Sequence, residues 1–109
     1  MKAALKYVGK SRYTLEDLKE IITILRAPDG CPWDREQTFD SLRSNTIEET
    51  YELADAITDH NMEGIKEELG DLLLHVVFYS KLGEEAGAFD YADAVSYTHL
   101  RAHETSAHL

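Results

Sequence analysis

Two acidic stretches decide the fold of this chain: Glu48-Glu49-Thr50-Tyr51-Glu52 and Glu68-Leu69-Gly70-Asp71. On an α-helix, residues three apart lie one turn from each other, so Glu49 pairs with Glu52 and Glu68 pairs with Asp71. We expect each stretch to be helical and the four carboxylates to converge on one metal ion. Ligation by oxygen alone favours Mg²⁺, with Mn²⁺ as an alternative, over zinc.

The second acidic stretch opens a segment that is apolar on nearly every side. Leu72-Leu73-Leu74-His75-Val76-Val77-Phe78 follows it directly, and such a helix belongs in a protein interior. We therefore expect this helix to be buried, and its acids with it. Buried carboxylates without a counter-charge would protonate, pair with a cation or bind a metal. The simpler alternative is that the acids only form a solvated helix face. This alternative explains either pair by itself well, but it explains the two pairs together less well.

The charge of the chain limits its partners. There are 21 Asp and Glu residues against 11 Lys and Arg residues, for a formal net charge of −10. Such a chain repels nucleic-acid backbones and anionic membranes, so we expect neither as a partner, and a polyphosphate would have to arrive bridged by metal. We expect no signal peptide and no membrane span. The single cysteine, Cys31, excludes an intramolecular disulfide and makes a reducing cytoplasm the default location.

The first third of the chain contains one clear helix. After a lead at 1–13, Thr14 is placed as the N-cap of a helix whose apolar residues recur at helical spacing. Residues 27–37 hold both prolines together with Gly30. Because proline and glycine favour turns over helices, residues 27–34 are predicted to form an ordered loop.

Three further helices are predicted after the loop. The spacing predicts a second helix over 38–58 and a third over 62–82, followed by a turn at 83–87, and Asp90 is placed to cap a fourth. No strand alternation is visible, so the predicted fold class is all-α, a helical bundle. One domain of 109 residues buries a modest core, and we expect dimerisation or a higher homo-oligomer to complete it.

Several motifs stand in the order found in the MazG family of all-α nucleoside triphosphate pyrophosphohydrolases, and the sequence resembles this family over about residues 14–95. The motifs are Leu25-Arg26, Gly30-Cys31-Pro32-Trp33-Asp34, Gln37-Thr38, Glu48-Glu49-x-x-Glu52, Glu68-Leu69-Gly70-Asp71-Leu72-Leu73 and Gly87-x-Phe89-Asp90. The loop motif before the acidic motifs makes the match specific.

The resemblance implies an enzyme that hydrolyses a nucleoside triphosphate between its α- and β-phosphates, giving the monophosphate and pyrophosphate. It also implies Mg²⁺ ligands at four positions: Glu49, Glu52, Glu68 and Asp71. Glu48 is matched to an auxiliary acid. Either Glu48 or Glu52 would orient or deprotonate the attacking water.

Other side chains are weaker candidates for substrate contacts. Trp33 could stack on the base of a nucleotide or simply plug one end of the bundle, and the sequence leaves both open. His75 is expected to be a core or second-sphere histidine. Three basic side chains are candidates for phosphate contacts: Arg26, Arg35 and Lys81.

The composition changes after Ser96. Residues 96–109 hold three of the five histidines, where the family has a basic segment, and this atypical tail resembles a translated sequencing adaptor or assembly artefact. We expect it to add little to the core. A rival to the enzyme hypothesis is a non-catalytic helical dimerisation or interaction module whose activity is lost through this atypical end. A di-iron bundle fits less well, because it requires Glu-x-x-His and Asp71 stands three residues after Glu68.

Overall fold

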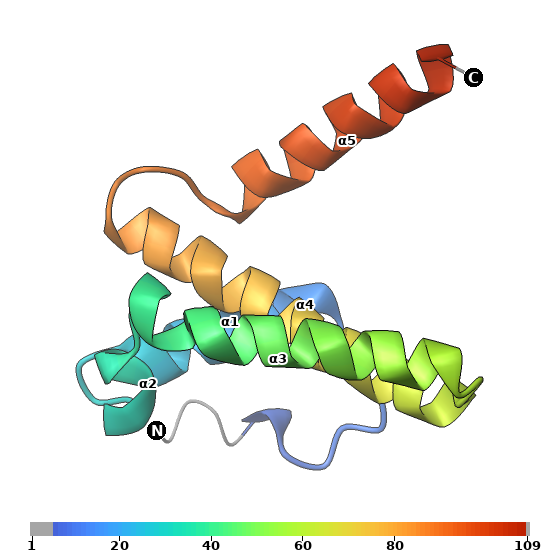
Figure 1. Ribbon diagram of the computed structural model, residues 1–109. Helices are drawn as coiled ribbons and strands as arrows, with labels where there is room; N and C mark the ends of the chain where they lie inside the picture. The colour runs from blue at the N-terminus through green and yellow to red at the C-terminus, as the bar shows by residue number, and fades with distance from the viewer. Residues whose placement is uncertain (1–5, 109) are drawn as a thin grey trace.

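The chain folds into five helices, and no strand is found in the part that the structure describes (Figure 1). The structure is a computed structural model that describes residues 6–108, with side chains described through residue 104. The helices are α1 (Leu15–Arg26), α2 (Pro32–Glu36), α3 (Phe39–Thr58), α4 (Met62–Glu85) and α5 (Tyr91–His108). The predicted all-α class is confirmed. Residues 1–5 of the predicted lead and residue 109 of the tail lie outside the described residues.

Helix α1 begins where its cap predicts. The Thr14 hydroxyl oxygen accepts from the backbone N–H of Asp17 at 3.1 Å, and the Asp17 carboxylate accepts from the backbone N–H of Thr14 at 3.0 Å. These two bonds satisfy donors that the first turn of a helix leaves without partners. The buried face of α1 is centred on Ile22, which is 2% exposed.

Helix α2 (Pro32–Glu36) begins inside the segment predicted as a loop, so that prediction is wrong for residues 32–34. Proline suits the first position of a helix, because its fixed φ is already helical and its missing N–H is not needed there. The preceding turn is tight, since Cys31 N–H donates to the carbonyl of Leu25 at 2.9 Å. A Cβ at Gly30 would lie 2.2 Å from that same carbonyl oxygen, so the turn admits only glycine.

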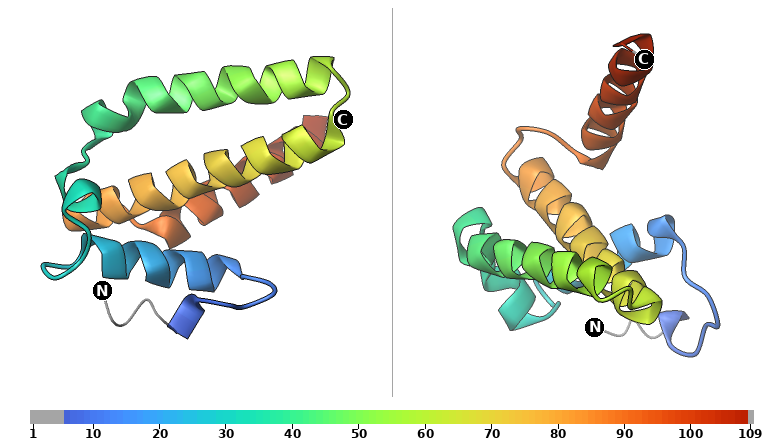
Figure 2. Two further views of the ribbon diagram at one scale, coloured as in Figure 1. Left: turned by 90° about the horizontal axis from the view of Figure 1, so that it is seen from below. Right: turned by 45° about the vertical axis from the view of Figure 1, so that its right-hand side comes forward.

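Helices α3 and α4 form an antiparallel pair, which Figure 2 shows most clearly from below. Thr38 caps α3 by accepting from Ser41 N–H at 3.0 Å, and Asn61 caps α4 by accepting from Gly64 N–H at 3.0 Å. The predicted turn at 83–87 is wrong in its first part, because α4 continues to Glu85. Gly83 stays helical, and the chain turns at Gly87, where φ is 69°.

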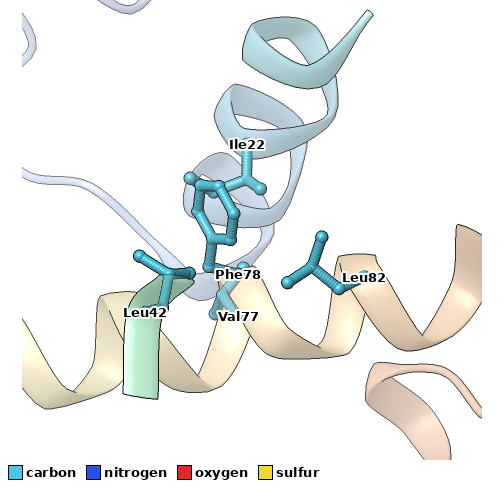
Figure 3. Close-up of a cluster of buried hydrophobic side chains, with 5 residues drawn as sticks. All are labelled: Ile22, Leu42, Val77, Phe78 and Leu82. Carbon is cyan, nitrogen blue, oxygen red and sulfur yellow. The ribbon is translucent and has the colours of Figure 1, made fainter. Parts of the chain in front are cut away.

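The hydrophobic core lies where α1 and α3 meet α4. Figure 3 shows its five buried side chains: Ile22 of α1, Leu42 of α3, and Val77, Phe78 and Leu82 of α4. Each of the three helices therefore contributes an apolar face to one cluster. This packing fixes α3 against α4 and so determines which of their polar residues meet.

Helix α4 is less buried in the single chain than its composition predicts. Leu69 is 52% exposed, Leu73 38% and Val76 46%, so the expectation of a helix covered on nearly every side is wrong for one copy of the chain. Helix α5 extends away from the other four helices in Figure 1, and Val76 faces it across a hollow of about 400 Å³ that is also lined by Val95 and Ala102 of α5.

Helix α5 begins at its predicted cap and includes the atypical tail. Asp90 and Asp93 exchange side-chain to backbone hydrogen bonds, both of 2.9 Å. Residues 96–104 are all exposed, which agrees with the expectation that the tail adds little to the core. Within the described residues, none of the helices combines the length and apolar character needed to cross a membrane.

Candidate metal centre

The antiparallel pairing of α3 and α4 brings three of the predicted ligands together. One carboxylate oxygen from each of Glu49, Glu68 and Asp71 lies within 4.8 Å of the others. Glu49 comes from the middle of α3 and the other two from consecutive turns of α4, as the i,i+3 spacing predicts. Glu52, the fourth predicted ligand, is exposed and is outside this triplet.

The triplet has the character of an ion site. One oxygen of Glu49 and one of Glu68 are buried, and neither has a hydrogen-bond partner among residues 6–108. A buried polar atom without a partner is costly, and a cation between the carboxylates would remove that cost. An all-carboxylate donor set fits a hard cation such as Mg²⁺.

The acids are less enclosed than expected from the sequence. Glu49 and Glu68 are half-buried, whereas Asp71 is exposed, so the prediction that the acids are buried with their helix is wrong for Asp71. The exposure of Asp71 places the triplet at the rim of the bundle. A rim position leaves room for waters and for a substrate, and Mg²⁺ commonly keeps several of its waters.

Crowding among the carboxylates makes ionisation unfavourable. Burial, followed by the neighbouring carboxylates of Glu68 and Asp71, raises the pKa of Glu49 from 4.5 to about 7. Burial and the charge of Glu68 also raise the pKa of Glu52. The Glu52 carboxylate therefore lies within electrostatic reach of the triplet, although it is not a member. A bound cation would reverse this effect by favouring the charged forms.

A hydrogen-bonded group lies one turn from the triplet. His75 is 8% exposed, and its Nδ1 lies 2.5 Å from the hydroxyl oxygen of Thr46 on α3. That hydroxyl is also 2.5 Å from the Tyr79 hydroxyl. Burial lowers the pKa of His75, with a smaller opposing effect of Asp71. These contacts agree with the predicted core or second-sphere histidine.

A cavity of about 160 Å³ lies near the triplet, one helical turn away along α3 and α4. Its lining includes Asn45, four residues before Glu49 on α3, and His75, four residues after Asp71 on α4, so the cavity lies one helical turn from the acids. The full lining is Ile22, Leu25, Trp33, Asp34, Leu42, Asn45, Leu74, His75 and Phe78. Trp33 forms part of the wall and is 59% exposed. An exposed ring at a cavity mouth can receive a flat ligand.

The remaining predicted residues are not part of the triplet. Glu48 is exposed beside it on α3. Lys81 lies ten residues beyond Asp71, about 15 Å along the axis of α4, and its ammonium is 3.5 Å from Glu84. Arg35 donates to the carbonyl of Pro28 at 2.7 Å.

Arg26 has a different environment from the one expected of a phosphate contact. Its guanidinium donates to both carboxylate oxygens of Glu85 and to backbone carbonyls at the end of α2. The predicted phosphate contact stays a prediction.

Residues 37–102 match the family model described as the MazG nucleotide pyrophosphohydrolase domain. The chain belongs to the MazG family. The matched segment contains α3 and α4 in full and thus every carboxylate of the candidate metal centre. The family resemblance inferred from the motifs is therefore confirmed.

Several curated proteins are similar to this MazG chain. The chain is 50% identical over 80 residues to the nucleoside triphosphate pyrophosphohydrolase/pyrophosphatase MazG of Thermotoga maritima, covering 73% of this chain and 31% of that protein. It is 48% identical over 80 residues to the nucleoside triphosphate pyrophosphohydrolase of Escherichia coli K12, covering 72% of this chain and 30% of that protein. It is 46% identical over 77 residues to the uncharacterized protein YabN of Bacillus subtilis, covering 71% of this chain and 16% of that protein. The chain thus matches less than a third of the length of each of these relatives.

Two contributors to this MazG site were missed in the sequence. Asn45 stands one turn before Glu49 on the same side of α3, so helical spacing could have indicated it. Asp34, which lines the cavity from α2, was missed because α2 was expected to be a loop. The pairing of Arg26 with Glu85, 59 residues apart, had no local signal.

Proposed function

We propose that this MazG domain hydrolyses nucleoside triphosphates to the monophosphate and pyrophosphate in a Mg²⁺-dependent reaction. The observation that supports this best is the triplet of Glu49, Glu68 and Asp71, one helical turn from a cavity with an aromatic wall. Two of its buried oxygens have no hydrogen-bond partner among the described residues. The printed names of the relatives from Thermotoga maritima and Escherichia coli agree with this activity.

The carboxylates would act first as the holders of Mg²⁺, with Mn²⁺ able to replace it. Glu49, Glu68 and Asp71 would supply ligand oxygens, and Glu52 would join them from the next turn of α3. When bound, Mg²⁺ neutralises triphosphate charge and lowers the pKa of a water molecule. Without a cation, a chain of net charge −10 would repel the substrate.

The other residues would position the reactants. Glu48 or Glu52 would orient the attacking water and accept its proton, because both are exposed acids within one helical turn of Glu49 on α3. Trp33 would stack on the base, and Asn45 and Asp34 would face its polar edges from the cavity wall. Arg35 and Lys81 stay candidates for contacts with the far phosphates.

The domain would work as a homodimer or higher homo-oligomer. Leu69, Leu73 and Val76 form an exposed apolar row on α4 at helical spacing, and such rows are usually covered by another protein surface. A second copy of the chain is the partner that a symmetric assembly requires. A cytoplasmic location, expected from the cysteine content, stays a prediction, as do the boundaries proposed for the domain at 14–95 and the tail at 96–109.

Pyrophosphate release tests this function. Purified protein would be incubated with a mixture of nucleoside triphosphates, in Mg²⁺ or in excess chelator. We expect pyrophosphate and monophosphate in equal amounts with Mg²⁺, and a loss of at least about a hundredfold in Asp71→Asn. Glu67→Gln, at an exposed acid on the same helix, is the matched control and should keep full activity. Absence of release from the wild type would favour the non-catalytic module instead.

A further inference from the structure

The guanidinium of Arg26 links the end of α1 to the end of α4. Its Nε donates to one carboxylate oxygen of Glu85 at 2.9 Å, and its Nη2 donates to the other at 2.5 Å. The Arg26 side chain is 9% exposed, and its guanidinium carbon lies 5.6 Å from the centre of the Phe78 ring. A two-pronged bond of this kind fixes both position and orientation.

The same guanidinium holds the end of α2. Its Nη1 donates to the backbone carbonyls of Asp34 at 2.6 Å, Arg35 at 3.2 Å and Gln37 at 2.9 Å. The last carbonyls of a helix lack partners within the helix, and a positive charge at that end is favourable. Arg26 thus supplies both the donors and the charge that α2 needs.

Helix α2 depends on such outside contacts. It has five residues, and Cys31 at its N-cap makes no side-chain capping bond among the described residues. Helices this short are not stable by themselves in water. Where α2 lies is therefore decided by the contacts that hold it, and Arg26 makes three of them.

The position of α2 determines one wall of the cavity. Trp33 and Asp34 belong to α2 and line the cavity together with Leu74, His75 and Phe78 of α4. Arg26 bonds to the end of α2 and also to Glu85 of α4. The Arg26–Glu85 pair therefore links the α2 wall of the cavity directly to the α4 wall. We propose that Arg26 and Glu85 are positioning residues that set the Trp33 wall against α4 and thereby set the affinity for the base of the nucleotide, an inference that rests on the proposed function.

This role differs from a direct phosphate contact by Arg26. The donors of the guanidinium are already directed at a carboxylate and at backbone carbonyls, and the carboxylate of Glu85 beside it would repel a phosphate. Lysine cannot replace arginine in this arrangement, because a single ammonium cannot bond to both carboxylate oxygens of Glu85 and also to the backbone carbonyls of α2. Arg26→Lys therefore keeps the charge and removes the geometry.

The first test uses Trp33, the only tryptophan of the chain, as a fluorescent reporter of α2 without metal or substrate. We expect Arg26→Lys and Glu85→Gln to shift its emission to longer wavelength and to increase its quenching by acrylamide, at temperatures well below unfolding. Arg101→Lys is the matched control, since Arg101 forms an exposed ion pair with Glu104 at 2.9 Å on α5. Emission and quenching equal to wild type in the folded variants would overturn the proposal. Glu85→Gln, the milder change, decides the matter if Arg26→Lys does not fold.

The second test separates positioning from phosphate binding by kinetics. We expect KM for the nucleotide to rise about tenfold in both variants, a factor typical of lost base stacking, while kcat stays within about twofold. A phosphate-binding Arg26 predicts the opposite for Glu85→Gln, because removal of a competing negative charge would lower KM. A lower KM would therefore overturn the proposal. If the wild type releases no pyrophosphate, the proposed function fails, and the fluorescence result still decides whether Arg26 and Glu85 position Trp33.

Discussion

Replacement of Glu49 by glutamine is expected to stabilise the protein without metal and to destabilise it, relative to wild type, with metal. Glu49 lies among acids that raise its pKa from 4.5 to about 7. A shift of that size corresponds to about 3 kcal/mol for a fully buried group. Because Glu49 is only half-buried, solvent screening reduces the expected gain in Glu49→Gln to about 1 kcal/mol.

The sign of the pH dependence follows from the same shift. The folded state holds the Glu49 proton more tightly than the unfolded state, so the stability that the protonated carboxyl contributes is complete below pH 4.5 and is lost as pH rises to about 7. In chelator, the advantage of Glu49→Gln over wild type should therefore grow across this window and stay constant above it.

The assay is urea denaturation in chelator at several pH values, repeated with Mg²⁺. Saturating Mg²⁺ should stabilise wild type by about 3 kcal/mol at a hundredfold excess over Kd and should leave Glu49→Gln nearly unchanged. Asp55→Asn, at an exposed acid elsewhere on α3, is the matched control. A Glu49→Gln variant that is less stable than wild type in chelator at pH 8 would refute the electrostatic reasoning.

Three further predictions concern the fold and assembly. Gly30→Ala should lower the free energy of unfolding by roughly 2 to 3 kcal/mol, because the new Cβ would clash with backbone atoms. Gly70→Ala, where the new Cβ has open space around it, should raise the free energy of unfolding by up to about 1 kcal/mol. Equal effects of the two variants in urea denaturation would contradict this. Wild type should sediment as a dimer or larger at micromolar concentration and Leu73→Lys as a monomer, and a monomeric wild type would exclude the proposed α4 interface. Deletion of 96–109 should lower the melting temperature by less than about 4 °C, and a larger fall would make the tail an integral element.

Local signals in the sequence predicted most helix boundaries and the meeting of three of the four acids. The predicted caps Thr14 and Asp90 depend on residues three positions away, so a single sequence contains them. The pairing of Glu68 with Asp71 likewise follows from helical spacing alone. Once α3 and α4 are placed antiparallel by their apolar faces, Glu49 has to meet the acids of α4.

The rest could not be predicted because it depends on tertiary placement. The exposure of Asp71 and Leu73 depends on how the other helices pack around α4, which no local pattern determines. Helix α2 was missed because Pro32 was interpreted as a helix breaker instead of a helix start. The roles of Arg26 and Glu85 come from a contact across 59 residues, beyond the reach of any local rule.

Calorimetric titration with Mg²⁺ tests the central claim most directly, because it detects the metal at the carboxylates without requiring turnover. The account predicts that wild type binds Mg²⁺, that Glu68→Gln and Asp71→Asn lose this binding while keeping their helical content, and that Glu67→Gln, one residue away on α4, binds as wild type does. Undiminished Mg²⁺ affinity in both Glu68→Gln and Asp71→Asn would contradict it.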